Sequence, residues 1–163
     1  MSIQLAPLLA ALTLFTSSTL NRFSNEQAKE SSTSTVCGND KILFYCRTTN
    51  GKKVEICDAG ETIRYAYGKI RGRPEIALSI ERNEARMRPW NGIGRWVSYS
   101  VLIRNGATTY EASIAFDRLS DEDEAGIYVF ADGELVAEIP CKLDTVRQSI
   151  NSTELTKAEE NEP

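Results

Sequence analysis

The stretch WVSYSVLIRNGATTYEASIAF, residues 96–116, decides the fold class. Apolar and polar residues alternate on both sides of Asn105-Gly106, and Asn-Gly between two such runs is the strongest short signal for a β-hairpin. A two-residue turn there predicts the apolar pairs Val101–Tyr110, Tyr99–Ala112 and Val97–Ile114 on one face. A register slip of one residue would move every side chain to the other face. The sequence therefore predicts an antiparallel hairpin with one apolar and one polar face.

Strand-like runs of the same kind recur on both sides of this hairpin. They occupy residues 42–48, 53–57, 62–68, 75–80, 126–131 and 134–141. Asn50-Gly51 predicts a type I′ turn after the first run. Asp132-Gly133 predicts a last hairpin with the pairs Phe130–Leu135 and Tyr128–Ala137. About eight short consecutive strands predict an all-β fold, either a small antiparallel barrel or a folded-over sheet, with an interior filled by side chains.

The cysteines indicate a disulfide-stapled protein. The chain has four cysteines, at 37, 46, 57 and 141, and no histidine. Without histidine, sites that depend on imidazole are excluded, and the absence of a C-x-x-C pair disfavours a zinc site. If the first and last strands are neighbours, Cys46–Cys141 would fasten the seam and Cys37–Cys57 would form the second bridge. The rival pairing is Cys46–Cys57 across the first hairpin, and the sequence leaves the choice open.

The N-terminal sequence predicts export. Residues 3–16, IQLAPLLAALTLFT, form an uncharged apolar run that suits a signal-peptide core better than a membrane span; the alternative is a buried helix. We expect a signal peptide at 1–20, a polar linker at 21–40, a β-barrel domain at 41–146 and a polar acidic tail at 147–163. Export implies a periplasmic or secreted protein in an oxidising compartment, with no membrane span after cleavage.

Charge is distributed unevenly along the chain. Residues 64–104 carry nine basic and three acidic side chains, whereas residues 105–163 carry four basic and fourteen acidic ones. One interpretation is that basic and acidic strands pair across the sheet. The other is that a basic, aromatic loop at 81–96, ERNEARMRPWNGIGRW, faces an acidic partner, because Arg and Trp are enriched at interface hot spots. The candidate binding residues are Arg86, Arg88, Trp90, Arg95 and Trp96, although one tryptophan could instead plug the barrel end.

No sequence motif points to catalysis. The acidic run SDEDEAG at 120–126 lacks the spacing of a calcium loop, and no phosphate-binding, nucleotide-binding or nucleophile motif is present. An acidic exported domain is a poor candidate for nucleic-acid binding. We therefore expect no enzyme activity, no metal, no cofactor and no nucleic-acid partner.

The layout resembles small exported bacterial β-barrel proteins. The shared features are LFYC at 43–46, an Asn-Gly hairpin, IRYAYGK at 63–69, a Trp-Gly segment and AGIYVFADGELVAEIPC at 125–141. More distantly, the chain is similar to the C-type lysozyme inhibitor barrels, with Gly126, Tyr128 and Gly133 at matching places of the late motif. That resemblance implies eight antiparallel strands with a late cysteine closing the seam. The inhibitory Ser and Lys of that family are absent here, so the resemblance implies the fold and not those site residues.

These features together favour a binding protein. We expect a monomeric, non-catalytic binding protein of the cell envelope whose basic loop inserts into the acidic cleft of a secreted hydrolase such as lysozyme. Two alternatives are a structural or stress-related envelope protein with no discrete site, and a carrier that holds a small ligand in a hollow interior.

Overall fold

The computed structural model describes residues 36–120 and 122–159. The chain divides into two units, Met1–Ser32 and Thr33–Pro163, and all the described residues belong to the second. The expected signal peptide at 1–20 and the linker as far as residue 35 lie outside the described residues. None of the helices in the described part is long and apolar enough to span a membrane.

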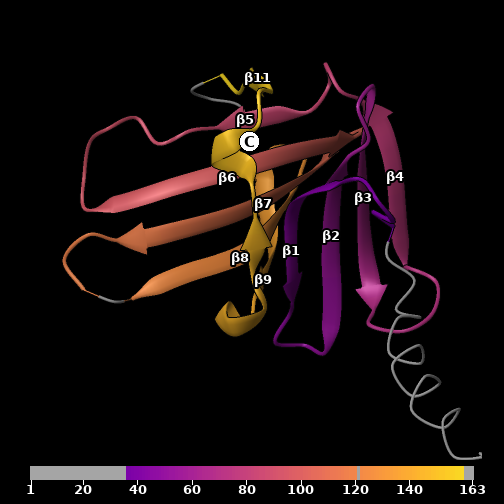
Figure 1. Cartoon of the computed structure of the whole chain (residues 1–163), viewed down its shortest axis with the longest axis horizontal. Coiled ribbons are helices and arrows are strands. Elements are labelled where there is room, and N and C mark those ends of the chain that lie inside the picture. The colour runs from indigo at the N-terminus through magenta and orange to yellow at the C-terminus, as the bar shows by residue number, and fades with distance from the viewer. Residues whose placement is uncertain (1–35, 121, 160–163) are drawn as a thin grey trace, which may run out of the picture. The chain divides into compact units, whose positions relative to one another are not determined.

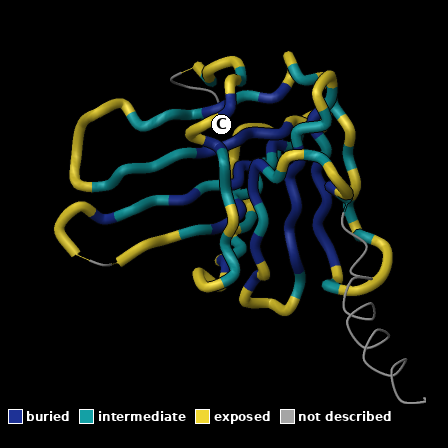
Figure 2. Tube along the Cα trace, viewed as in Figure 1, coloured by how far each residue is buried: buried dark blue, intermediate teal, exposed yellow. Residues whose placement is uncertain are grey.

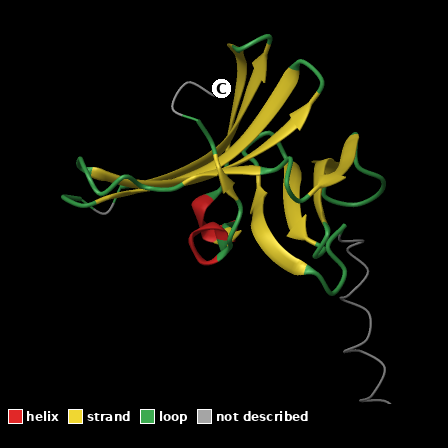
Figure 3. Cartoon of the chain, turned by 90° about the horizontal axis from the view of Figure 1, so that it is seen from above, coloured by secondary structure: helices red, strands yellow, loops and turns green. Residues whose placement is uncertain are grey.

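The described chain is built from two open β-sheets (Figure 1). The first sheet has the order β10 (Arg147–Gln148), β1 (Lys41–Arg47), β2 (Lys52–Asp58), β3 (Thr62–Lys69) and β4 (Ile76–Glu81). The second has the order β11 (Thr156–Lys157), β5 (Arg86–Arg88), β6 (Trp96–Asn105), β7 (Thr108–Asp117), β8 (Asp123–Ala131) and β9 (Glu134–Pro140). Two short 3-10 helices follow β9, η1 (Leu143–Thr145) and η2 (Ile150–Ser152) (Figure 3). Strand pairs are antiparallel except β11–β5.

The all-β prediction is confirmed, but the closed barrel is wrong. The described residues form eleven strands in two sheets, rather than about eight strands in one closed sheet. Closure fails because β9 pairs only with β8 and ends its sheet, while the place beside β1 is taken by β10. The three additional strands, β5, β10 and β11, have three residues or fewer, too few for an alternating pattern to be visible in the sequence.

The segment after residue 146, expected to be a polar acidic tail outside the barrel domain, packs against the first sheet in its described part. Ile150 is 1% exposed and belongs to the core cluster, so this segment does bury apolar surface. Its hydroxyl groups also attach it to the first sheet: Ser149 Oγ donates to the carbonyl of Ile42 at 2.7 Å, and Lys41 Nζ donates to Thr153 Oγ1 at 2.8 Å. One buried isoleucine and these polar contacts order the chain as far as β11.

The hairpin β6–β7 keeps the predicted faces with a different register. Val101 lies opposite Ala112 and Tyr99 opposite Ile114, a shift of two residues from the predicted pairs. The turn residues are Gly106, with a φ of 60°, and Ala107, which keeps a negative φ. Positive φ at the first central position alone matches a type II′ turn rather than the I′ turn of Asn-Gly. Because the shift is even, every side chain stays on its predicted face.

The other two hairpins are predicted only in part. At Asn50-Gly51 only Gly51 has a positive φ, 82°, so the expected type I′ turn is wrong and the loop is longer. Asp132 and Gly133 both have positive φ, 51° and 83°, as a type I′ turn requires. Phe130 pairs with Leu135 as predicted, and a bulge then places Val129 opposite Ala137.

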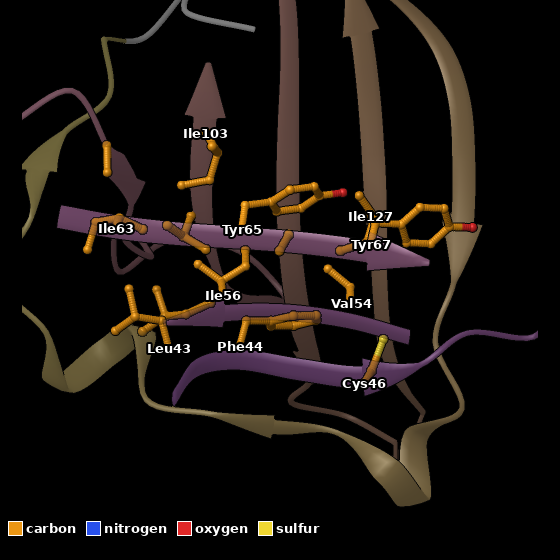
Figure 4. Close-up of a cluster of buried hydrophobic side chains, with 14 of the residues drawn as sticks. Leu43, Phe44, Cys46, Val54, Ile56, Ile63, Tyr65, Tyr67, Ile103 and Ile127 are labelled. Carbon is orange, nitrogen blue, oxygen red and sulfur yellow. The ribbon is translucent and has the colours of Figure 1, made fainter. Parts of the chain in front are cut away.

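The core lies where apolar side chains of both sheets meet (Figure 4). Leu43, Phe44 and Ile56 of the first sheet and Ile103 and Ile127 of the second are fully buried. The rings of Tyr65 in β3 and Tyr110 in β7 stack with their centroids 4.8 Å apart. Contacts of this kind hold the sheets together without closure, because each sheet covers the apolar face of the other.

Two disulfides fasten this arrangement, with the pairing Cys37–Cys57 and Cys46–Cys141. The predicted pairing is therefore confirmed, and the rival Cys46–Cys57 is not formed. Cys141 follows β9 and bridges to Thr48 at the end of β1, so the second disulfide links the two sheets rather than closing a barrel. All four cysteines are bonded.

Candidate functional site

The loops that connect β5 to β6 and β7 to β8 lie together at one side of the described unit (Figure 1). The backbone N–H of Arg118 donates to the carbonyl of Arg95 at 3.0 Å, and Arg118 Nη1 donates to the carbonyl of Gly94 at 3.3 Å. We call the residues that these bonds bring together the hairpin tip. It consists of Trp90, Ile93, Arg95, Arg118 and Leu119.

The hairpin tip exposes two large aliphatic side chains. Ile93 is 77% exposed and Leu119 is 79% exposed, more than any other large apolar residue in the described ranges. Both loops are exposed along most of their length (Figure 2). A single exposed apolar residue on a protein surface is ordinary, but two at the end of adjacent hairpins form a surface suited to contact with another molecule.

Trp90 folds back onto its own loop. Its indole Nε1 donates to the carbonyl of Ile93 at 3.1 Å, and the guanidinium of Arg118 lies 5.5 Å from its ring. Asn91 Oδ1 accepts a hydrogen bond from the N–H of Ile93 at 3.0 Å, which closes a local turn. The loop is therefore held by its own contacts, and it presents Ile93 in a defined position.

Arg95 joins the two hairpins through Asp117. Its Nε lies 2.6 Å from Asp117 Oδ1 and 2.8 Å from Oδ2, and its Nη2 also binds Oδ2. The hydroxyl of Ser120 and the N–H of Leu119 donate to the same carboxylate, at 2.6 and 3.0 Å. The Arg95 guanidinium, assisted by these two donors, holds the pKa of Asp117 well below its usual range.

Arg95 keeps part of its surface free for a partner. Its side chain is 49% exposed, and its guanidinium lies 5.9 Å from the ring of Trp96. Because Nε and Nη2 of Arg95 bind Asp117, Nη1 is the guanidinium nitrogen that can still donate a hydrogen bond to a carboxylate of another molecule. The position of Arg95 therefore depends on Asp117, and the Nη1 end of its guanidinium stays outside that ion pair.

The five residues predicted from sequence fall into two groups. Trp90 and Arg95 belong to the hairpin tip, and Trp96 is the half-buried first residue of β6. Arg86 and Arg88 lie on β5, where Arg86 donates to the carbonyls of Asn83 and Ala85, and Arg88 Nη1 lies 2.6 Å from Glu111 Oε1. The structure does not bring these two arginines to the tip.

Arg118 and Leu119 are the tip residues that sequence reasoning missed. They lie in the loop of the next hairpin, so nothing in the sequence shows that they are close in space to the Trp-rich segment. One indication was present in the sequence: Leu119 is a large apolar residue in the polar turn DRLSDEDE, residues 117–124.

The charge pattern favours pairing between segments within the chain. Arg88–Glu111 and Arg95–Asp117 each join the basic segment 64–104 to the acidic segment 105–163. Exposed carboxylates at Glu122, Asp123 and Glu124 follow the tip along the second hairpin. The tip is therefore amphipathic and mixed in charge, rather than uniformly basic.

A separate hollow of about 360 Å³ lies beside β8 and β9. Glu124, Tyr128, Glu138 and Pro140 are among its lining residues. Burial raises the pKa of Tyr128, and the nearby carboxylates of Glu138, Glu124 and Glu111 raise it further. Within residues 36–120 and 122–159, no group of three or more Cys, Asp or Glu side chains is arranged to hold a metal ion.

Comparison of the chain with models of known protein families, with curated proteins and with solved structures finds no match. Function is therefore inferred from the geometry of the chain itself.

Proposed function

We propose that this chain is an exported, non-catalytic binding protein of the cell envelope that inserts the hairpin tip into a cleft of a protein partner. A secreted hydrolase such as lysozyme is the class of partner that we propose. The observation that carries the proposal is the exposure of Ile93 and Leu119 at the end of two hairpins that are fixed to each other.

The rigidity of the hairpin tip supports binding rather than a passive surface. Association costs conformational entropy for each loop that must become ordered, so a loop held in shape before binding loses less affinity. The Trp90–Ile93 hydrogen bond and the Arg95–Asp117 ion pair supply that order in the free protein. An aliphatic pair flanked by an indole and two guanidinium groups has the composition of an interface hot spot.

The proposed compartment and partner follow from further features. Two disulfides support an oxidising location, the periplasm or the outside of the cell. Hydrolase clefts that cleave glycosidic bonds contain a pair of carboxylates. Arg95 Nη1 and Arg118 would meet such carboxylates once Ile93 and Leu119 occupy the apolar part of the cleft.

The test uses two double variants of matched chemistry. Ile93→Ser/Leu119→Ser removes the exposed aliphatic side chains of the tip, and Leu135→Ser/Val136→Ser removes two others, 48% and 60% exposed, on β9. Binding to a panel of purified secreted hydrolases, with a C-type lysozyme first, is measured by titration calorimetry together with residual hydrolase activity. We expect wild type and the β9 variant to bind and inhibit alike.

The tip variant should bind at least about 30-fold more weakly, because two hot-spot side chains each contribute 1 kcal/mol or more. If both variants lose affinity for the hydrolase equally, the hairpin tip is not part of the interface. If no hydrolase binds, and tip variants fully rescue an envelope defect caused by deleting the gene, the protein has the structural role instead.

A further inference from the structure

A second surface, distant from the hairpin tip, is strongly basic. The connection between β3 and β4 carries Lys69, Arg71 and Arg73, all exposed. Within the described residues, these three side chains make no ion pair or hydrogen bond. Together with Lys52 on the adjoining β2, they form what we call the basic patch.

The charge of the basic patch is not neutralised by its neighbours. Lys52 Nζ lies 2.6 Å from Glu75 Oε2. Four cations against this one carboxylate leave the patch at +3, although the whole chain carries −4. Such a local excess of one sign attracts an anionic surface.

One strand pairing places two of these cations opposite each other, and of the two only Lys52 has a carboxylate partner, Glu75, among the described residues. Lys52 lies directly opposite Lys69 in the β2–β3 register. Like charges directly opposite in a sheet destabilise it, and sequences break local rules of this kind mainly at functional positions. The pairing is therefore evidence for a role of the patch outside the fold.

The loop that carries the patch is held close to the sheet. At Gly68 a Cβ atom would lie 2.5 Å from the backbone nitrogen of Glu75, so the chain returns against β3 at a distance that only glycine permits. The N–H of Glu75 donates to the carbonyl of Tyr67 at 2.9 Å. This close return fixes where Lys69, Arg71 and Arg73 are presented.

The described chain also begins beside this patch. The N–H of Val36 donates to Glu55 Oε2 at 3.2 Å, and Val36 and Lys69 line the same small hollow. Upstream, the apolar run 3–16 is separated from Val36 by residues 17–35. Nineteen residues can span at most about 65 Å, so the patch stays within reach of the bilayer for as long as the expected signal peptide at 1–20 remains uncleaved.

We infer that the basic patch binds the surface of a bilayer that contains anionic phospholipid headgroups. The hairpin tip lies at the opposite side of the described unit (Figure 1). The membrane would therefore hold the protein by one side and leave the tip exposed to a partner. This inference does not depend on the identity of that partner.

The test is co-sedimentation of the full chain with two kinds of vesicle, pure phosphatidylcholine and a 7:3 mixture of phosphatidylcholine with phosphatidylglycerol. Insertion of the apolar run does not require anionic lipid, so the readout is the increase in binding caused by phosphatidylglycerol. We expect a clear increase at 50 mM NaCl that is largely lost at 500 mM, because salt screens charges at the membrane surface.

Two charge-reversal variants separate the patch from overall charge. Lys69→Glu/Arg71→Glu/Arg73→Glu and the control Arg47→Glu/Lys142→Glu/Lys157→Glu change the net charge equally, and all six side chains are exposed. In the patch variant, the increase in binding caused by phosphatidylglycerol should be roughly 100-fold smaller, because each cation removed weakens binding by about a factor of five. In the control variant, this increase should fall much less. Circular dichroism confirms that each variant is folded.

Three results would overturn the inference: no phosphatidylglycerol-dependent increase for wild type, equal loss in the two variants, or complete displacement by millimolar inorganic phosphate at constant ionic strength. The last would indicate a discrete phosphate site in place of a membrane-binding surface.

Discussion

Removing the two disulfides one at a time should destabilise the protein unequally. The residues of Cys46–Cys141 are 95 apart in sequence and those of Cys37–Cys57 are 20 apart. In the chain-entropy model, the first bridge stabilises by about 4.7 kcal/mol and the second by about 3.3 kcal/mol, because the longer loop restricts the unfolded chain more. The predicted difference in the free energy of unfolding is therefore about 1.4 kcal/mol.

The comparison uses Cys46→Ala/Cys141→Ala and Cys37→Ala/Cys57→Ala. All four cysteines are buried, so each variant removes two buried sulfur atoms and the packing losses largely cancel. Urea unfolding followed by far-ultraviolet circular dichroism gives the free energies. The thermal midpoints should fall by roughly 20 °C and 13 °C respectively, at about 4 °C for each kcal/mol.

The native structure should survive loss of the longer bridge. Thr49 N–H still donates to the carbonyl of Pro140, and Lys142 N–H to that of Arg47, at 2.9 and 2.7 Å. Partner binding through the hairpin tip is therefore expected to be unchanged in this variant. The opposite order would contradict this prediction. If Cys37→Ala/Cys57→Ala is the less stable variant at equal denaturant slopes, loop length does not govern how much each bridge stabilises the protein.

Three further predictions concern single positions. Gly68→Ala should lower the free energy of unfolding by about 1–3 kcal/mol, because its Cβ would collide with the backbone of Glu75; urea titration measures this, and an unchanged midpoint would contradict the close contact. The pKa of Asp117 is lowered in the folded state, so its ion pair with Arg95 stabilises the protein above the unfolded carboxyl pKa of about 4, and this contribution disappears as pH falls below that value. Asp117→Asn should flatten the acid limb of the stability–pH curve, and a curve identical to wild type would refute the role of this pair. Burial raises the pKa of Tyr65 above its unfolded value, so the protein loses stability above a pH of about 10 as the unfolded phenol ionises. Absorbance at 295 nm should show two late-titrating tyrosines, Tyr65 and Tyr128, and Tyr65→Phe should remove the later of the two.

The positions of the long strands could be predicted because alternation and turn residues are local properties. Gly106 and Asp132-Gly133 mark their turns through the positive φ that those turns require. The exact register was not predictable in β6–β7, because a period of two residues is unchanged by a shift of two. The pattern could identify the buried face of each strand but could not identify its partner residue.

Closure and the small strands depend on contacts between distant parts of the chain. Arg147–Gln148 takes the place beside β1, where the burial of Ile150 and the hydrogen bonds of Ser149 to the first sheet hold the segment. Nothing in the local composition of that polar segment indicates this. The same limit applies to the hairpin tip: the Trp-rich loop gave Trp90 and Arg95, whereas Arg118 and Leu119 join it only through the pairing of β6 with β7.

The Cys46–Cys141 disulfide joins two distant parts of the chain, and this sets how the protein responds to a pulling force. Tension applied between Cys37 and Cys141 runs along the backbone from Cys37 to Cys46 and then crosses that disulfide. Only the nine residue steps from Cys37 to Cys46 lie in the taut path, although Cys37 and Cys141 are separated by 104 positions. Complete mechanical unfolding between these two points would lengthen that path to no more than about 40 Å. A molecule pulled between these two positions would thus act as a short, nearly inextensible link.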